Sequence, residues 1–216
     1  MAKITAENDV EAVFLDALGT LVSLEPPWIG LRRALGDEVP EDRLVMAVRA
    51  EMAYYRDHAH EGRDEESLRA LREASAQVLS QGLGFEVPAQ VLVDAIRFDP
   101  FLEAPAALAE LRELGLRLVC VSNWDVSLTE VLERCDLATA LDGVVSSAEA
   151  GARKPDPAIF GPALEIAGCS AEQALHVGDT VEEDVEGARA AGIRALHLDR
   201  GGEGDIASLA EIAEHV

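Results

Sequence analysis

The chain has 216 residues, 49% of them hydrophobic, which is enough for one α/β domain with an insertion or for two small domains. Its 41 acidic residues against 18 basic ones give a formal charge of −23, so the surface should repel nucleic-acid phosphates and anionic lipid headgroups, and we expect neither as a partner. The sequence has no apolar leader, no run long enough to span a membrane and no cysteine pattern, so we expect a cytoplasmic protein with reduced thiols and no structural metal.

The first predicted element is a buried strand over the apolar run Ala12 to Leu15. The residues that follow it are Asp16-Ala17-Leu18-Gly19-Thr20-Leu21. An aspartate that a buried strand delivers onto a Gly-Thr turn contributes little to packing, but it is well placed for nucleophilic attack. We therefore predict that Asp16 is a catalytic residue.

A helical insertion follows the first strand. Between Val22 and Asp99 the pattern predicts helices and no strand, with long helices over Asp42 to Ala59 and Glu65 to Leu83. An insertion of this size should form its own layer over the carboxyl ends of the strands, where ligands bind in such sheets. We therefore predict a helical cap subdomain over residues 22–99 and an α/β catalytic core made of residues 1–21 and 100–216.

Four more apolar runs predict buried parallel strands, and helical segments separate them. The runs are Leu116 to Val121, Leu141 to Val145, Ala174 to Val177 and Ile193 to Leu198. Strands that alternate with helices in this way build a doubly wound parallel sheet. The expected fold class is therefore α/β, with a Rossmann-like core.

Polar residues follow the predicted strands where each strand ends. Ser122 and Asn123 follow the second strand, Lys154 comes after the third, and Asp179 and Asp184 come after the fourth. Because the carboxyl ends of parallel strands meet at one edge of a sheet, these residues and the first aspartate should form one site. Plain structural roles stay open, since Ser122 and Asn123 are also good helix N-caps and acidic residues suit a first helical turn.

Taken together, these motifs resemble those of the haloacid dehalogenase superfamily of hydrolases, with the helical cap inserted after the first motif (subfamily I, C1 cap). The residues that carry the resemblance are Asp16 to Thr20, Ser122, Lys154 and Gly178 to Asp184. The resemblance covers essentially the whole chain. It implies a hydrolase that acts on a small-molecule substrate.

The resemblance also implies roles for the residues around the nucleophile. Asp16 would attack phosphorus and form an aspartyl phosphate, which divides one hard displacement into two easier ones. Ser122 and the adjacent amides would hold a phosphoryl oxygen, with Asn123 beside them as a second substrate-binding residue. Lys154, one of only two lysines in the chain, would offset charge between nucleophile and substrate.

A magnesium site is the second implication of the resemblance. Asp16, the carbonyl group of Leu18 and Asp179 would hold Mg²⁺, a hard cation that prefers oxygen ligands. Asp184 would complete the metal site, or would orient Lys154 or a metal-bound water. The expected substrate is a phosphate ester or an acyl phosphate, and the expected protein is a monomer or a homodimer.

Leu18 departs from the phosphatases of this family, whose second aspartate protonates the leaving alcohol and later activates water. Acid and base help of this kind is typically worth about 10²–10⁴ in rate, and a leucine supplies neither. Three hypotheses follow. In the first, the chain is a Mg²⁺-dependent phosphatase whose leaving group needs little protonation or takes its proton from the cap or from water. In the second, it is a metal-independent 2-haloacid dehalogenase. In the third, it binds a metabolite without turnover.

The dehalogenase hypothesis rests on the first motif, because the motif Asp-Ala-Tyr-Gly-Thr-Leu of those enzymes is similar to this one. Three later positions differ, since Phe160, Asp179 and Val181 stand where the resemblance would place tyrosine, serine and asparagine. If a haloacid did bind, a cap arginine would hold its carboxylate, and Arg49 and Arg56 are the candidates by position, with Arg49 chosen. Asp179 with its acidic neighbours favours a metal site and a phosphoryl substrate.

Overall fold

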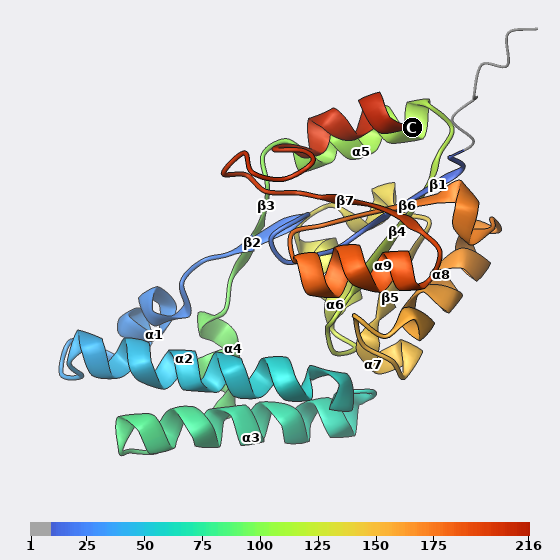
Figure 1. Ribbon diagram of the computed structural model, residues 1–216. Coiled ribbons are helices and arrows are strands. Elements are labelled where there is room, and N and C mark those ends of the chain that lie inside the picture. The colour runs from blue at the N-terminus through green and yellow to red at the C-terminus, as the bar shows by residue number, and fades with distance from the viewer. Residues whose placement is uncertain (1–9) are drawn as a thin grey trace, which may run out of the picture.

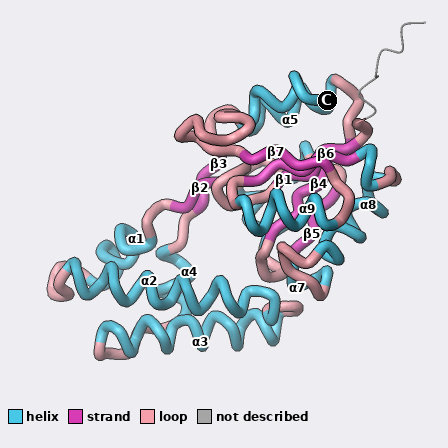
Figure 2. The backbone as a smooth tube through the Cα atoms, viewed as in Figure 1, coloured by secondary structure: helices cyan, strands magenta, loops and turns pink. Residues whose placement is uncertain are grey.

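The computed structural model describes residues 10–216, and a five-stranded parallel sheet forms its centre (Figures 1 and 2). In spatial order the strands are β5 (Gly143–Ser146), β4 (Arg117–Ser122), β1 (Ala12–Leu15), β6 (Ala174–Gly178) and β7 (Arg194–His197). Every predicted core strand is present, which confirms the α/β, Rossmann-like fold class. The part of the predicted core before residue 10 lies outside the described residues.

Helices cover both faces of the sheet, because neighbouring residues of each strand point to opposite sides. Val13 and Leu15 of β1 pack with α5 (Ala104–Glu113), α6 (Leu128–Arg134) and the last helical segment, whereas Ala12 and Phe14 pack with α8 (Phe160–Ala167) and α9 (Gly187–Ala190). Each fully buried side chain of this size contributes roughly 1.5–3 kcal/mol. The core helices are α5 (Ala104–Glu113), α6 (Leu128–Arg134), α7 (Ser147–Ala150), α8 (Phe160–Ala167) and α9 (Gly187–Ala190), with a π-helix at Val181–Glu186 and 3₁₀ segments at Ala138–Ala140, Pro157–Ile159, Ala171–Gln173 and Leu209–His215.

Four helices between β1 and α5 pack around an apolar cluster of their own. They are α1 (Pro27–Leu35), α2 (Glu41–His58), α3 (Glu65–Leu83) and α4 (Ala89–Ala95), with a 3₁₀ turn at Ala59–Glu61. The two long predicted helices therefore occur almost at their predicted bounds. Asp64 begins α3 by accepting a hydrogen bond from the Ser67 amide at 2.8 Å, and Gly84 ends it at a left-handed φ of 77°. Among residues 10–216, no helix is both long and apolar enough to cross a membrane.

The prediction of no strand between Val22 and Asp99 is wrong at both ends of that range. β2 (Val22–Leu24) pairs antiparallel with β3 (Phe98–Pro100), and this two-stranded ribbon connects the four helices with the core (Figure 2). A strand of three residues shows too little alternation to be recognised from a sequence. Its pairing joins segments that are distant in the chain, which no local pattern reports.

Candidate active site

Asp16 lies immediately after β1, the middle strand of the sheet, and is only 6% exposed. Its Oδ1 accepts two hydrogen bonds, one from the hydroxyl of Ser122 at 2.8 Å and one from Nζ of Lys154 at 2.6 Å. Ser122 is the last residue of the adjacent strand β4, so the sheet itself brings these two side chains together. The structure thus brings together the three residues predicted as catalytic, with Ser122 and Lys154 both within hydrogen-bond distance of Asp16.

Lys154 is fully buried and connects two carboxylates. Its Nζ also donates to Oδ1 of Asp184 at 2.5 Å, so one ammonium group lies between the carboxylates of Asp16 and Asp184. Two negative groups this close in a buried site repel each other unless a cation compensates them. The long, flexible side chain of Lys154 places one ammonium group against both carboxylates.

Asn123 uses its side-chain amide to hold the backbone of Lys154. Its Oδ1 accepts from the Lys154 amide at 2.7 Å, and its Nδ2 donates to the Lys154 carbonyl at 3.0 Å and to Glu183 at 3.0 Å. Glu183 in turn lies 3.7 Å from Arg153. The predicted substrate-binding residue Asn123 therefore makes its contacts within the protein, where it positions the lysine.

Three carboxylates form a group that could hold a cation. Asp16, Asp179 and Asp184 each offer an oxygen, and these oxygens lie within 4.8 Å of one another. Oxygen-only donor sets of this kind suit a hard divalent cation such as Mg²⁺. Asp184 already accepts three hydrogen bonds, whereas Oδ2 of Asp16 accepts none from the described residues. The donor set therefore fits Mg²⁺ best through Asp16 and Asp179.

Gly19 makes room for this group. Its φ is +85°, and a Cβ at this position would lie 2.1 Å from Oδ2 of Asp179, so a larger residue would displace that carboxylate. The neighbouring Leu18 is 39% exposed and makes a single backbone bridge to Val22. An apolar side chain therefore stands in the turn where the resemblance would place a carboxyl group.

The pKa values of the buried groups show why a cation is favourable here. Burial raises the pKa of Asp16 to about 7, and the charges of Asp184 and Asp179 act in the same direction against the opposing charge of Lys154. Burial and Asp184 likewise raise the pKa of Asp179. Burial alone would lower the pKa of Lys154, but the two carboxylates raise it, so the ammonium stays charged. A bound divalent cation would stabilise the ionised form of Asp16, which is the nucleophilic form.

His176 is a member of this network that the sequence analysis did not single out. It lies on β6 and its Nε2 is 3.0 Å from Oδ1 of Asp184. A histidine in a buried strand more often packs in the core than serves a site, and nothing in the local pattern separates the two cases. The signal that could have found it is its position two residues before Gly178, on the strand that Asp179 directly follows.

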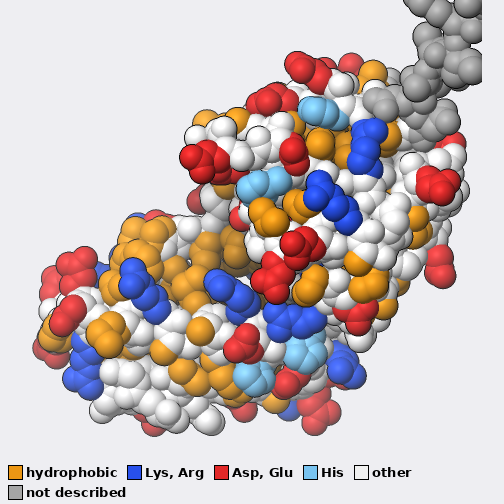
Figure 3. All heavy atoms as spheres, viewed as in Figure 1, with side chains coloured by type: hydrophobic (Ala, Val, Ile, Leu, Met, Phe, Trp, Pro, Cys, Tyr) orange, Lys and Arg blue, Asp and Glu red, His pale blue; other side chains and the backbone are white. Residues whose placement is uncertain are grey.

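The last turn of α2 and the 3₁₀ turn that follows it, here called the cap tip (Tyr55–Arg63), touch the loop that follows Ser122. The hydroxyl of Tyr55 donates to Oδ2 of Asp125 at 2.7 Å, and the Val126 amide donates to the Gly62 carbonyl at 2.9 Å. Figure 3 shows that the surface is hollowed between the helices and the core, and that hydrophobic side chains line this hollow. The cap tip therefore contacts the core close to Ser122, one of the residues that hold Asp16.

Arg49, predicted to hold a substrate carboxylate, lies exposed on α2. Among the described residues, no hydrogen bond or ion pair links it to Asp16, Ser122 or Lys154. Its role in substrate binding stays a prediction.

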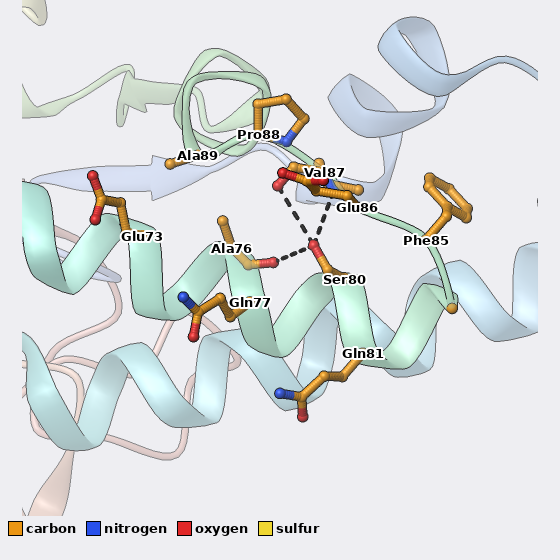
Figure 4. Close-up of a pocket in the computed structure, with 11 residues that line it drawn as sticks. Glu73, Ala76, Gln77, Ser80, Gln81, Phe85, Glu86, Val87, Pro88 and Ala89 are labelled. Atoms are coloured by element: carbon orange, nitrogen blue, oxygen red, sulfur yellow. Dashed lines mark hydrogen bonds between the residues drawn. The ribbon is translucent and has the colours of Figure 1, made fainter.

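A cavity of about 720 Å³ lies among the helices at a distance from the core (Figure 4). Its walls are α3 and the segment that leads to α4. The hydroxyl of Ser80 on α3 connects the two walls by accepting a hydrogen bond from the Val87 amide at 2.9 Å, and it donates within α3 to the Ala76 carbonyl at 2.7 Å. Because no core residue lines it, this cavity is separate from the site around Asp16.

Comparisons with known proteins agree with the fold. The model of the haloacid dehalogenase-like hydrolase family matches residues 10–192. A phosphoserine phosphatase of Thermus thermophilus is 43% identical over 106 residues, which are 49% of this chain and 43% of that protein. The chain therefore spans less than half the length of that relative.

Two solved structures cover nearly the whole chain. The L-2-haloacid dehalogenase of Xanthobacter autotrophicus superposes with a TM-score of 0.73 at 22% identity, covering 95% of this chain and 97% of that one. The HAD phosphatase of Thermococcus onnurineus superposes with a TM-score of 0.67, also at 22% identity and with the same coverage. At this identity the likeness shows the fold alone, and a dehalogenase and a phosphatase share it.

Proposed function

We propose that this chain, which belongs to the haloacid dehalogenase-like hydrolase family, is a Mg²⁺-dependent phosphatase that acts on a small phosphorylated molecule. The observation that carries the proposal is the group formed by Asp16, Asp179 and Asp184 around Lys154. Three carboxylates and one ammonium leave a net negative charge that a divalent cation would neutralise. The phosphatase activity in the name of the Thermus relative supports the same proposal.

The first step of the proposed reaction takes place at Asp16. A carboxylate oxygen of Asp16 forms a bond to phosphorus while the bond from phosphorus to the leaving oxygen breaks and its electron pair goes to that oxygen. Ser122 and Lys154 hold Oδ1, so the other oxygen, Oδ2, stays open toward the substrate or the cation. Asp16, Asp179 and the Leu18 carbonyl would hold Mg²⁺, which supplies positive charge for the transferred phosphoryl group.

In the second step the oxygen of a water molecule forms a bond to phosphorus. The bond between Asp16 and phosphorus breaks, its electron pair returns to the Asp16 carboxylate, and inorganic phosphate leaves while the proton of the water passes to solvent. Lys154 stays charged throughout, since both of its carboxylate partners raise its pKa, so it stabilises the added negative charge and does not serve as the base. With leucine at position 18, no side chain from this turn gives a proton to the leaving group, and an acyl phosphate or another good leaving group is the substrate class that fits best.

A 2-haloacid dehalogenase is the second candidate, and Leu18 is the observation that favours it. Halide leaves without a proton, so this chemistry needs no acid at position 18. Against it stands Asp179, whose carboxylate belongs to the group around Asp16 and would repel an anionic haloacid. A third candidate, a protein that binds a metabolite without turnover, would show ligand-dependent thermal stabilisation and no product.

We also propose the division of labour between the two parts of the chain. Residues 1–21 and 100–216 would form the catalytic core, and residues 22–99 would form a cap that covers the site and selects the substrate. The contacts of the cap tip with the loop after Ser122 support this arrangement. Substrate identity would then reside in cap residues such as Arg49.

The phosphoenzyme is the direct test of the proposed mechanism. After mixing with ³²P-labelled acetyl phosphate and Mg²⁺ and quenching with acid, the protein should carry label that hydroxylamine removes, because acyl phosphates are cleaved by this nucleophile. The variant D16N should carry no label and release no phosphate. Label that persists in D16N, or phosphate release by D16N at the wild-type rate, would exclude Asp16 as the nucleophile.

A further inference from the structure

His176 occupies a special position behind the catalytic lysine. It is 0% exposed on β6, and its Nε2 meets the same Oδ1 of Asp184 that accepts from Lys154. The other oxygen of Asp184 accepts from the Thr180 amide at 2.9 Å. Three donors from three segments of the chain therefore hold one carboxylate, and His176 is the donor that no role assigned above explains.

The hydrogen bond fixes which ring nitrogen carries the proton. An ionised carboxylate only accepts, so Nε2 of His176 must be the donor toward Asp184. Burial lowers the pKa of His176, with Asp184 acting against this effect and Lys154 adding to it. A neutral donor supports Asp184 without a second positive charge beside Lys154. The ring plane is held by Phe160, whose ring meets it edge to face at 5.0 Å between centroids.

Asp184 packs directly on the strand that carries His176. A Cβ at Gly178 would lie 2.1 Å from Cγ of Asp184, so the absence of a side chain at this residue lets the carboxyl group reach the strand. Burial would raise the pKa of Asp184, but Lys154 and the hydrogen bond from His176 lower it, so Asp184 stays ionised. An ionised Asp184 of fixed orientation is what holds Nζ of Lys154 against Asp16.

We propose that His176 is a positioning residue of the hydrolytic site: its Nε2–H fixes the orientation of Asp184, and through Asp184 it places the Lys154 ammonium against Asp16. The proposal rests on the proposed function for its kinetic consequence, and on geometry alone for the hydrogen bond. Groups that orient a catalytic or metal-binding residue in this way typically change activity about 10–100-fold when they are removed. No atom of His176 needs to touch the substrate.

Kinetics with acetyl phosphate and Mg²⁺ test the positioning role. H176L, which removes the donor at similar volume, should lower kcat about 10–100-fold with little change in KM. H176Q, whose Nε2 can reach the same carboxylate, should recover most of kcat. F160L is the matched control, because it loosens the packing of the ring and leaves its donor in place, so it should lower the thermal midpoint more than kcat. Equal losses in H176L and H176Q, or a kcat that follows only the thermal midpoint in all three variants, would overturn the proposal.

A second readout needs neither substrate nor metal. Long-range ¹H–¹⁵N NMR of the wild-type protein should show His176 neutral, with its proton on Nε2. D184N should shift this resonance, because an amide replaces the carboxylate that accepts the hydrogen bond. A proton on Nδ1, or a resonance that D184N leaves unmoved, contradicts the proposal even if H176L fails to fold. If the wild-type protein hydrolyses no phosphate but shows this tautomer, the proposed function fails while the role of His176 in holding Asp184 stands.

Discussion

At the scale of single residues, the site combines a buried aspartate with an apolar side chain two positions later. The carboxylate of Asp16 is held by Ser122 and Lys154 as nucleophilic catalysis requires, yet the turn that follows carries Leu18. A leucine gives no proton to a leaving alcohol and takes none from water. In the proposed mechanism Leu18 would therefore act as a filter for leaving groups and would leave the site active.

The variant L18D tests this account of the substrate range. The new carboxyl group should raise kcat/KM for an alkyl phosphate such as glycerol phosphate by about 10²–10⁴, because a poor leaving group gains the most from an acid. It should change kcat/KM little for para-nitrophenyl phosphate, whose leaving group departs without a proton. L18N, which has the same shape and no proton to give, is the control. Equal gains in kcat/KM on both substrates, or a gain with L18N, would contradict the account that position 18 limits activity because it lacks an acid for the leaving group.

At the scale of elements, one hydrogen bond joins the cap tip to the loop that follows Ser122. Tyr55 comes from α2, and its partner Asp125 lies three residues after Ser122 and is only 2% exposed. Burial and Asp125 raise the pKa of Tyr55, so its hydroxyl keeps its proton and donates it. The contact is local in space and lies 70 residues apart in the chain, which is why the sequence analysis did not predict it.

Removing this hydroxyl should destabilise the protein. Y55F leaves Oδ2 of the buried Asp125 without its donor, and an unsatisfied buried group of this kind costs about 1–3 kcal/mol, measured as a lower urea midpoint. Y54F is the matched control, because Tyr54 is the neighbour on α2, its ring stacks on His58 at 4.0 Å, and phenylalanine keeps the stack. Its cost should stay within about 0.5 kcal/mol. Equal losses of unfolding free energy in Y55F and Y54F would mean that the hydrogen bond from Tyr55 to Asp125 does not stabilise the protein.

At the scale of the whole molecule, the sequence predicts what depends on local pattern. The buried core strands and the helix over Glu65–Leu83 were predicted because apolar periodicity is a local signal. The ribbon of β2 and β3 was missed because each strand has only three residues and its partner is distant in the chain. The position of His176 beside Asp184 depends on how β6 meets the π-helix at Val181–Glu186, so no spacing rule reports it.

The same reasoning explains which site residues were open to prediction. Parallel strands end at one edge, so the topology alone places Asp16 beside Ser122. The topology does not say that Asn123 binds the backbone of Lys154, because that depends on the path of a loop. The formal charge of −23 argues against nucleic acid and anionic lipid as partners, but it does not specify which small molecule binds at the site around Asp16.

The central claim is that Asp16 works with a divalent cation on a phosphoryl group. The most direct measurement follows phosphate release from acetyl phosphate and para-nitrophenyl phosphate, with Mg²⁺ and with EDTA, beside chloride release from 2-chloropropionate under both conditions. The account predicts phosphate release that EDTA abolishes and Mg²⁺ restores, with no chloride. Chloride release that persists in EDTA would contradict it, because the apolar first motif would then outweigh the carboxylate of Asp179.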